Sequence, residues 1–234
     1  MMKWTNQLAS HLNWSGDISN KEEKQQVADQ VAGKVRDGDV IGIGSGSTAF
    51  LALQAIVQRV KEEGIDVKGI PTSKEAELNC SVLGLPTTTL IDSKPDWGFD
   101  GADEVDGEYR LIKGRGGAML REKLVMASAE KTYILVDQSK IVTRLGEKFA
   151  VPVEVDARAI HLVESKLEAF SGVTDIKMRM AEKKDGPVIT EGGHVILDVT
   201  FDNIDADAEK DLKGIPGVVE TGLFAGYPIE ILSV

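Results

Sequence analysis

The feature that most constrains the fold is a regular alternation of short apolar runs with longer amphipathic segments along the first 137 residues. The short runs predict buried strands, and the apolar spacing of the longer segments predicts helices. Such an alternation is typical of a mostly parallel sheet that helices cover on both faces, so we expect a doubly wound, Rossmann-like α/β fold. The predicted strands are 40–43, 66–71, 87–91, 97–105, 109–114 and 132–137, and the predicted helices are 21–35, 48–63, 73–83 and 118–130.

The rhythm changes after residue 150, where strand and helix patterns follow the order β-α-β-β-α-β. This is the order of the ferredoxin-like split unit, and it predicts a second, smaller α+β domain. We expect residues 1–150, with 225–234 returning to the first sheet, to form a Rossmann-like catalytic domain. Residues 151–224 are expected to form the small domain. The first twenty residues are interpreted as a loose arm, or as a helix that packs elsewhere.

The composition excludes several classes of function. The formal net charge is -11 at pH 7, and an acidic chain binds nucleic acid poorly because phosphates are met by clustered Lys and Arg. Cys80 is the only cysteine, and His11, His161 and His194 are too dispersed for a zinc site. The N-terminus lacks the apolar core of a signal peptide, and no run reaches the roughly 18 apolar residues of a membrane helix. We expect a cytoplasmic protein that contacts neither nucleic acid nor membrane.

The segment "GIGSGSTA" (42–49) predicts an anion-binding turn after the first strand. Its glycines allow a tight turn, and the amides of the next helix, with the hydroxyls of Ser45, Ser47 and Thr48, can hold an anion. The segment also fits the dinucleotide fingerprint, but "TSK" (72–74) follows the second strand in place of the acid that holds an NAD ribose. Hydroxyls and a lysine suit a monophosphate, which we favour. NADP, and a turn without a ligand, are left open.

Acidic residues crowd the segment "GFDGADEVDGE" (98–108). The spacing of a calcium loop fails, because Ala102 and Val105 occupy the third position after Asp100 and Asp103. A magnesium site needs only one or two carboxylates, so spacing does not exclude it. Both aspartates lie at a strand end among small and apolar residues, which a solvated acidic turn does not explain.

Lys113 supplies a cation for these acids, and the glycine cluster 114–117 offers amides that can hold a developing oxyanion. Glu122 follows within the next predicted helix, where a solvent-facing Glu that interacts with the helix dipole is the commoner interpretation. Arg121 and Lys123 are interpreted as surface or phosphate-facing charges. With the phosphate turn, this set suits proton transfer next to a carbonyl, in which a carboxylate takes a proton from carbon.

The segments "GIGSGSTA", "IPTS", "FDGADEVD", "LIKGRGGAMLREK" and "LVDQSK" occur in the order found in type A ribose-5-phosphate isomerases, which this chain resembles from about residue 21 to about residue 224. The resemblance implies interconversion of D-ribose 5-phosphate and D-ribulose 5-phosphate in the non-oxidative pentose phosphate pathway. It implies a cis-enediolate intermediate, no organic cofactor and no required metal. It also implies a homodimer or homotetramer with the small domain at the interface.

The resemblance further implies roles for single residues. Glu122 is the general base between C2 and C1, Asp100 assists ring opening and moves the proton between O1 and O2, and Asp103 orients the sugar. Lys113 stabilises the enediolate. Arg115 stands where many members have glycine and is interpreted as a surface charge or an extra anion contact. The implied substrate-binding residues are Ser45, Gly46, Ser47, Thr48, Asp100, Gly101, Ala102, Asp103, Lys113, Gly114, Arg115, Gly116 and Lys140.

Two other classes of protein share parts of this pattern. An amino-sugar phosphate isomerase-deaminase shares the phosphate turn but enlists a catalytic His, and no His lies near the quoted segments. A sugar-phosphate sensor would tolerate loss of Glu122 and would carry a module for DNA or a partner. The acids and the lysine favour the isomerase.

Overall fold

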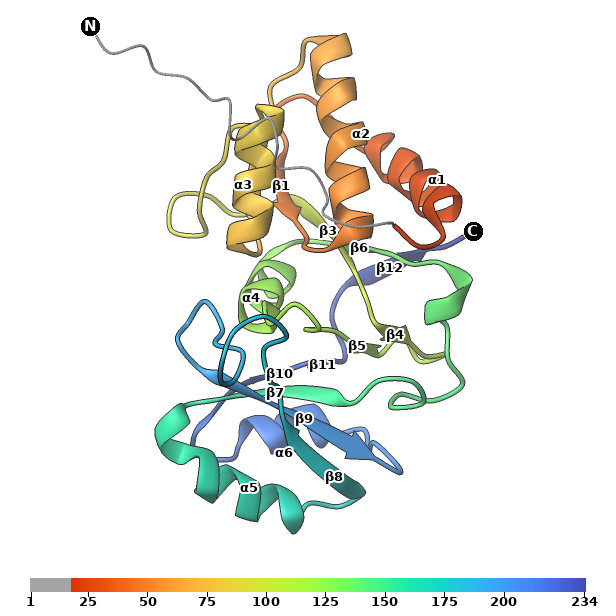
Figure 1. Ribbon diagram of the computed structural model, residues 1–234. Coiled ribbons are helices and arrows are strands. Elements are labelled where there is room, and N and C mark those ends of the chain that lie inside the picture. Colours follow the sequence, from red (N-terminus) through yellow and green to blue (C-terminus); the bar gives the residue numbers. More distant parts are fainter. Residues whose placement is uncertain (1–17) are drawn as a thin grey trace, which may run out of the picture.

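The computed structural model describes residues 18–234 and contains a five-stranded sheet in the order β12-β6-β3-β1-β2. All four pairings in this sheet are parallel. Figure 1 shows α1 and α2 on one side of the sheet and α3 and α4 on the other, which confirms the predicted doubly wound fold. The elements are α1 (Lys21–Ala32), β1 (Val40–Ile43), α2 (Ser47–Glu63), β2 (Lys68–Pro71), α3 (Lys74–Leu83), β3 (Trp97–Gly101), α4 (Met119–Ser128), β6 (Thr132–Leu135) and β12 (Ile229–Leu232).

The core of this unit forms where α1 and α2 pack on the sheet. Ile41 and Ile43 of β1 are fully buried, as is Ile56 of α2. Burial of each such side chain contributes about 1.5–3 kcal/mol, so the apolar strand β1 becomes a central strand of the sheet. Helix α1 ends at Ala32, before the predicted end at residue 35.

The predicted strand at 87–91 is wrong. A single bridge, between Thr87 and Gly69, links this segment to the sheet, and the N–H of Thr88 donates to the Gly69 carbonyl at 2.8 Å. The chain then turns at Thr89, because its hydroxyl accepts a hydrogen bond from the N–H of Ile91 and its backbone carbonyl accepts one from the N–H of Asp92. Local side-chain bonds of this kind compete with strand pairing. Ile91 is left exposed in consequence.

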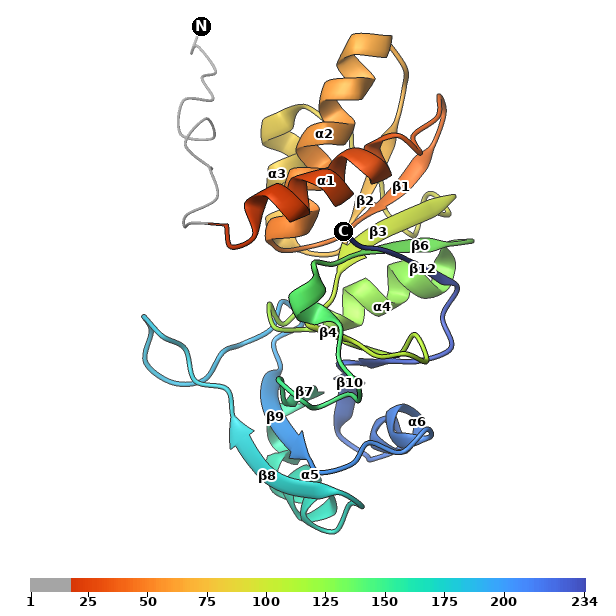
Figure 2. The same ribbon diagram turned by 90° about the vertical axis from the view of Figure 1, so that its right-hand side faces the viewer.

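The second unit has the predicted ferredoxin-like order (Figure 2). Its four strands form an antiparallel sheet in the order β10-β7-β9-β8. It has a separate apolar core, in which Val153, Val163, Leu167 and Val199 are fully buried. The elements are β7 (Val151–Val155), α5 (Ile160–Glu168), β8 (Val173–Met178), β9 (Val195–Phe201), α6 (Ala208–Lys213) and β10 (Val218–Thr221).

A small third sheet joins the two units. It consists of β4 (Glu104–Val105), β5 (Leu111–Ile112) and β11 (Leu223–Phe224), and β5 pairs with both of the others. The chain then returns to the large sheet, where β12 pairs with β6 as predicted. Because β11 lies within the predicted small domain and β5 within the large one, the sheet ties both units together. The domain boundaries at 150 and 224 stay predictions.

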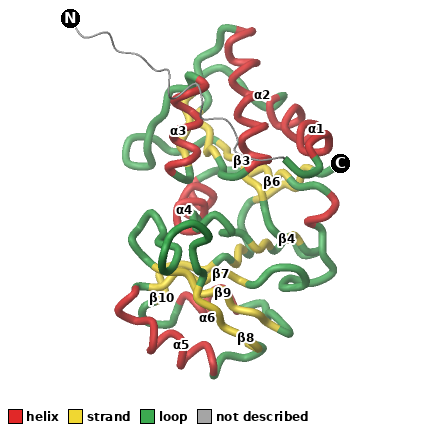
Figure 3. Tube along the Cα trace, in the orientation of Figure 1, coloured by secondary structure: helices red, strands yellow, loops and turns green. Residues whose placement is uncertain are grey.

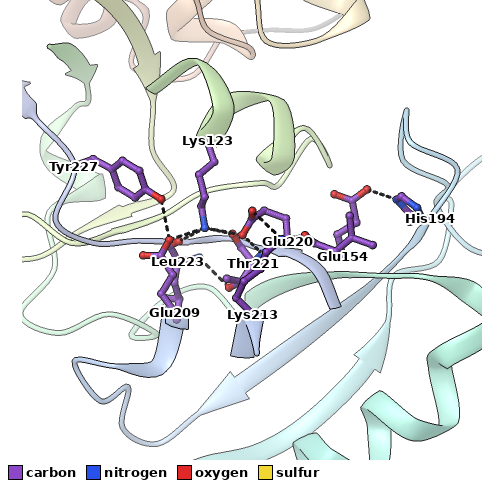
Figure 4. A network of polar contacts seen from close by, with 10 residues as sticks. Lys123, Glu154, His194, Glu209, Lys213, Glu220, Thr221, Leu223 and Tyr227 are labelled. Atoms are coloured by element: carbon purple, nitrogen blue, oxygen red, sulfur yellow. Dashed lines mark hydrogen bonds and ion pairs between the residues drawn. The ribbon is translucent and has the colours of Figure 1, made fainter. Parts of the chain in front are cut away.

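A buried polar network lies at the same junction (Figure 4). The Lys123 ammonium is 2.8 Å from the Leu223 carbonyl, 2.9 Å from Glu220 Oε1 and 2.7 Å from Glu209 Oε1. Only 7% of Lys123 is exposed. The prediction of a surface or phosphate-facing charge is therefore wrong for Lys123, which attaches α4 to β10 and α6.

Within residues 18–234, no helix is long and apolar enough to cross a membrane. His11 lies outside the described residues, as does the predicted N-terminal arm apart from residues 18–20. Cys80 is buried in α3, and burial raises the pKa of its thiol to about 12.

Candidate active site

The carboxyl ends of β1, β3 and β6 open onto a cavity of about 700 Å³. In an open parallel sheet this edge is where ligands bind. The structure brings almost all the predicted site residues together there. Asp100 is the exception, since it does not line the cavity and lies against Lys113. The predicted residues in the lining are Ser45, Gly46, Ser47, Thr48, Gly101, Ala102, Asp103, Lys113, Gly114, Arg115, Gly116, Glu122 and Lys140.

One end of the cavity is the turn between β1 and α2. A Cβ atom at Gly44 would lie 2.6 Å from the Phe99 carbonyl oxygen, so the close approach of this turn to β3 requires glycine. Gly46 has φ +87° and precedes Ser47, the first residue of α2. No side-chain cap covers this helix start, which leaves its amides open to an anion.

Sequence reasoning missed Lys24, which also lines this end. Its ammonium lies 3.4 Å from the Ser47 hydroxyl, and only 6% of the residue is exposed. Burial lowers the pKa of Lys24. Asp137 opposes this shift, whereas Lys140 and Arg115 lower the pKa further. Three cations therefore meet at one end of the cavity, where an anion would stabilise their charged forms.

The sequence did carry a signal for Lys24. The residue lies three and seven positions before Val27 and Val31, on the apolar face of α1. A lysine on such a face is either paired or functional.

The "TSK" segment (72–74) is divided by the structure. Thr72 and Ser73 are buried and bond the Ser45 hydroxyl at 2.9 and 2.6 Å. Lys74 instead pairs with Glu77, and 67% of its side chain is exposed. Lys74 does not line the cavity, so the prediction that it serves a phosphate is wrong.

A buried cluster of three charged groups forms the opposite side of the site. The Lys113 ammonium lies 3.0 Å from Asp100 Oδ2 and 3.5 Å from Glu122 Oε1. It also donates to the Gly101 carbonyl at 2.5 Å. The Lys113 ammonium, from the segment after β5, therefore joins a residue of β3 to one at the start of α4.

Burial dominates the electrostatics of this cluster. It raises the pKa of Asp100, and the attraction of Lys113 and two backbone amides offset it only in part. Burial alone would lower the pKa of Lys113, but Asp100 and Glu122 outweigh it and the pKa is raised. Burial raises the pKa of Glu122 to about 8; Lys113 opposes this shift, and Asp100 and Asp103 add to it.

Glu122 has one oxygen to spare. Oε1 faces Lys113, whereas Oε2 is buried and has no hydrogen-bond partner. The residue lines the cavity and is 6% exposed, so the interpretation as a solvent-facing Glu is wrong. A buried carboxylate oxygen without a donor is costly, because it loses its hydration without gaining a partner.

The glycine cluster forms a tight turn beside these groups. The N–H of Gly117 donates to the Gly114 carbonyl at 2.9 Å. Gly114 and Gly117 have φ angles of +97° and +77°, a region that favours glycine. The amide of Arg115 lies 3.3 Å from Asp103 Oδ2, and Arg115 itself is exposed at the cavity.

The remaining predicted charges have different surroundings. Lys140 lines the cavity, with its ammonium 5.0 Å from the centre of the Phe149 ring. Arg121 does not line it; its guanidinium pairs with Glu191 at 2.5 Å. Glu191 lies in the long connection between β8 and β9, a loop that reaches the large unit (Figure 3). Arg121 therefore ties this loop to α4 and does not face a phosphate.

Among residues 18–234, no histidine lines this cavity. His194 lies outside it, with Nδ1 2.9 Å from Glu154 Oε1 (Figure 4), and His161 is exposed. Among residues 18–234, no group of three or more His, Cys, Asp or Glu side chains is placed to hold a metal ion. That the reaction needs no organic cofactor and no metal stays a prediction.

Comparison with known proteins identifies the family. A model of the family described as ribose 5-phosphate isomerase A (phosphoriboisomerase A) matches residues 68–233. The chain belongs to this family. Ribose-5-phosphate isomerase A of Thermosynechococcus vestitus is 44% identical over 220 residues, which cover 92% of each chain.

Solved structures agree. The ribose 5-phosphate isomerase A of Methanocaldococcus jannaschii has a TM-score of 0.87 and 42% identity, covering 91% of this chain and 95% of that one. A D-ribose-5-phosphate isomerase in complex with phospho-erythronic acid has a TM-score of 0.87 and 36% identity, covering 92% of this chain and 95% of that one. The predicted family and fold are thereby confirmed.

Proposed function

We propose that the chain interconverts D-ribose 5-phosphate and D-ribulose 5-phosphate through a cis-enediolate. The observation that carries the proposal is the placement of Glu122, which lines the cavity with Oε1 3.5 Å from the Lys113 ammonium and Oε2 without a hydrogen-bond partner. Membership of the isomerase family and the phospho-erythronic acid bound by a relative support the substrate class.

The phosphate group binds at the cationic end. The ammonium of Lys24 and that of Lys140 supply charge, and the amides and hydroxyls of Ser47 and Thr48 supply donors. This binding places the carbonyl end of the open-chain sugar at Glu122. Asp103 lines the cavity between the two ends and orients the sugar hydroxyls.

Glu122 then moves the proton between carbon atoms. Its carboxylate takes the proton from C2, the C2–H electron pair forms the C1–C2 double bond, and the carbonyl oxygen O1 becomes anionic. Lys113 and the Gly116 amide of the turn 114–117 stabilise that oxygen. Asp100, whose pKa burial raises, passes the hydroxyl proton from O2 to O1. Glu122 returns its proton to C1, which leaves the carbonyl at C2.

The alternatives find less support. An amino-sugar phosphate isomerase-deaminase enlists a histidine, and the part of the cavity lining that the structure describes contains none. A sugar-phosphate sensor gains nothing from a buried Glu122 whose pKa is raised to about 8. A raised carboxyl pKa near the working pH is what a general base needs.

We infer the wider setting from the family. The chain acts in the cytoplasm, in the non-oxidative pentose phosphate pathway, as a homodimer or homotetramer without organic cofactor or required metal. Residues 1–150 with 225–234 form the catalytic domain, and 151–224 the small one. Sedimentation of the purified chain tests the assembly.

The deciding experiment measures ribulose 5-phosphate formation from ribose 5-phosphate in EDTA, with no added cofactor. We expect activity in the wild type and a loss of at least ~10²-fold in Glu122→Gln, the low end for a general base. Binding of inorganic phosphate survives in the variant. A folded but inactive wild type would overturn the proposed function.

A further inference from the structure

Arg179, the residue after β8, reaches from the small unit to the glycine turn of the active site. Its Nη1 atom donates to the carbonyls of Gly114 and Arg115, at 2.9 and 2.8 Å. The rest of its guanidinium is held by Asp198 of β9, through Nε at 2.9 Å and through Nη2. Only 17% of the Arg179 side chain is exposed. One fixed guanidinium thus binds two successive carbonyls of this turn.

The carbonyl orientation decides where the amides of the turn point. Peptide bonds here are trans, so each C=O points opposite to the N–H of the next residue. The Gly114 carbonyl is therefore opposed by the amide of Arg115, and the Arg115 carbonyl by the amide of Gly116. Arg179 does not line the substrate cavity; it lines a neighbouring cavity of about 530 Å³. The Arg115 amide consequently points away from Arg179 and donates to Asp103 Oδ2 at 3.3 Å, and the Gly116 amide points away from Arg179 toward the substrate side.

A glycine turn does not hold this orientation by itself. The central peptide of a four-residue turn can flip, which converts type I into type II when the third residue tolerates positive φ. The third residue here is Gly116, which tolerates it freely, yet its φ is not positive. After a flip, the Arg115 carbonyl would face the substrate and the Gly116 amide would turn away. An enediolate oxygen would then meet a carbonyl dipole of the wrong sign.

We propose that Arg179 is a positioning residue that keeps the Gly116 amide directed at the reacting oxygen and the Arg115 amide on Asp103. The inference rests on the proposed isomerase function and deepens it. Arg179 does not touch the substrate; it acts through the two carbonyls that it binds, and Asp198 fixes it in place. The small unit thereby takes part in catalysis from behind the turn.

The test compares Arg179→Met with Arg110→Met. Arg110 is a matched control because its side chain is 21% exposed, pairs with Asp106 at 2.8 Å and donates to the Ile204 carbonyl, away from the cavity. For Arg179→Met we expect kcat to fall ~10–100-fold, somewhat less than loss of a whole oxyanion donor. KM should stay within about threefold, because the phosphate end is untouched.

Ligand binding separates positioning from general damage. On this proposal we expect the carboxylate of phospho-erythronic acid to accept from the Gly116 amide, and inorganic phosphate to occupy only the cationic end. Arg179→Met should weaken the binding of phospho-erythronic acid about tenfold, in parallel with the loss in kcat, and should leave the Kd of phosphate unchanged. Arg110→Met should change neither.

Asp198→Asn keeps the shape of the pair and serves if Arg179→Met does not fold. It should lower kcat and raise the Kd of phospho-erythronic acid, each by a smaller factor than Arg179→Met does. If the wild type is active and Arg179→Met or Asp198→Asn leaves kcat unchanged, the inference about Arg179 is overturned and the proposed function stands. Equal losses for both ligands, or in Arg110→Met, would also overturn it. An inactive wild type would overturn the proposed function and this inference with it.

Discussion

The Lys113 ammonium lies 3.5 Å from one carboxylate oxygen of Glu122, while the other oxygen has no hydrogen-bond partner. The ammonium is close enough to favour the ionised form, but burial outweighs it, and the pKa of Glu122 is raised to about 8. A carboxyl balanced in this way is a stronger base than a solvated one and still ionises near neutral pH.

The first prediction concerns the pH dependence of kcat/KM, which reports ionisation in the free enzyme. Glu122 must be ionised to take a proton, so kcat/KM should rise with pH and level off above about 8. Asp100 raises this pKa, so Asp100→Asn should move the rise to lower pH. Lys113 lowers it, so Lys113→Met should move the rise to higher pH. The measurement is the initial rate across the pH range. If kcat/KM rises with the same midpoint in the wild type and in both variants, Glu122 is not the general base.

The second prediction concerns stability. Glu122 has a higher pKa in the folded chain than the ordinary 4.5, so the unfolded chain releases its proton first as pH rises. The stability that the neutral form contributes is full below about 4.5 and is lost as pH rises toward about 8. Glu122→Gln should therefore gain thermal stability over the wild type increasingly between these values. A Tm difference that does not change with pH would contradict the shift.

The alternation of strands and helices was enough to predict the parallel sheet and the ferredoxin-like unit. The failures have local or distant causes that such patterns do not carry. Thr89 bends the predicted strand 87–91 through its own hydroxyl. The burial of Lys123 depends on Glu220, 97 positions away in the chain. Arg179 likewise meets Gly114 across 65 positions, so neither contact could be predicted from spacing.

The third prediction tests the cationic end of the cavity. Lys24→Met removes a buried ammonium 3.4 Å from the Ser47 hydroxyl. A charge-assisted hydrogen bond contributes about 1.5–3 kcal/mol, so KM should rise ~10–100-fold while kcat falls much less. Lys21→Met, an exposed position one turn earlier in α1, is the control and should leave KM unchanged. Equal KM values for Lys24→Met and wild type would mean that the phosphate lies elsewhere.

The fourth prediction tests the buried network that joins α4 to the small unit. Lys123→Met leaves Glu220, Glu209 and the carbonyls of Thr221 and Leu223 without their shared cation. Removing one partner of a buried ion pair costs about 3–5 kcal/mol, because the remaining charge stays buried. Urea unfolding should show a loss of that size. Lys131→Met, which breaks only the exposed pair with Glu230, should barely move the midpoint.

The position of Lys123 makes this variant informative about catalysis as well. It follows Glu122 directly in α4, and the segment that it binds also accepts the N–H of Lys113 at the Gly222 carbonyl, 2.9 Å away. If the network only stabilises the fold, the folded fraction of Lys123→Met should keep its kcat at low temperature. If it also sets the distance between Glu122 and Lys113, kcat per folded molecule should fall. We expect the fall, because both proposed catalytic residues, Glu122 and Lys113, are held through residues 220–223.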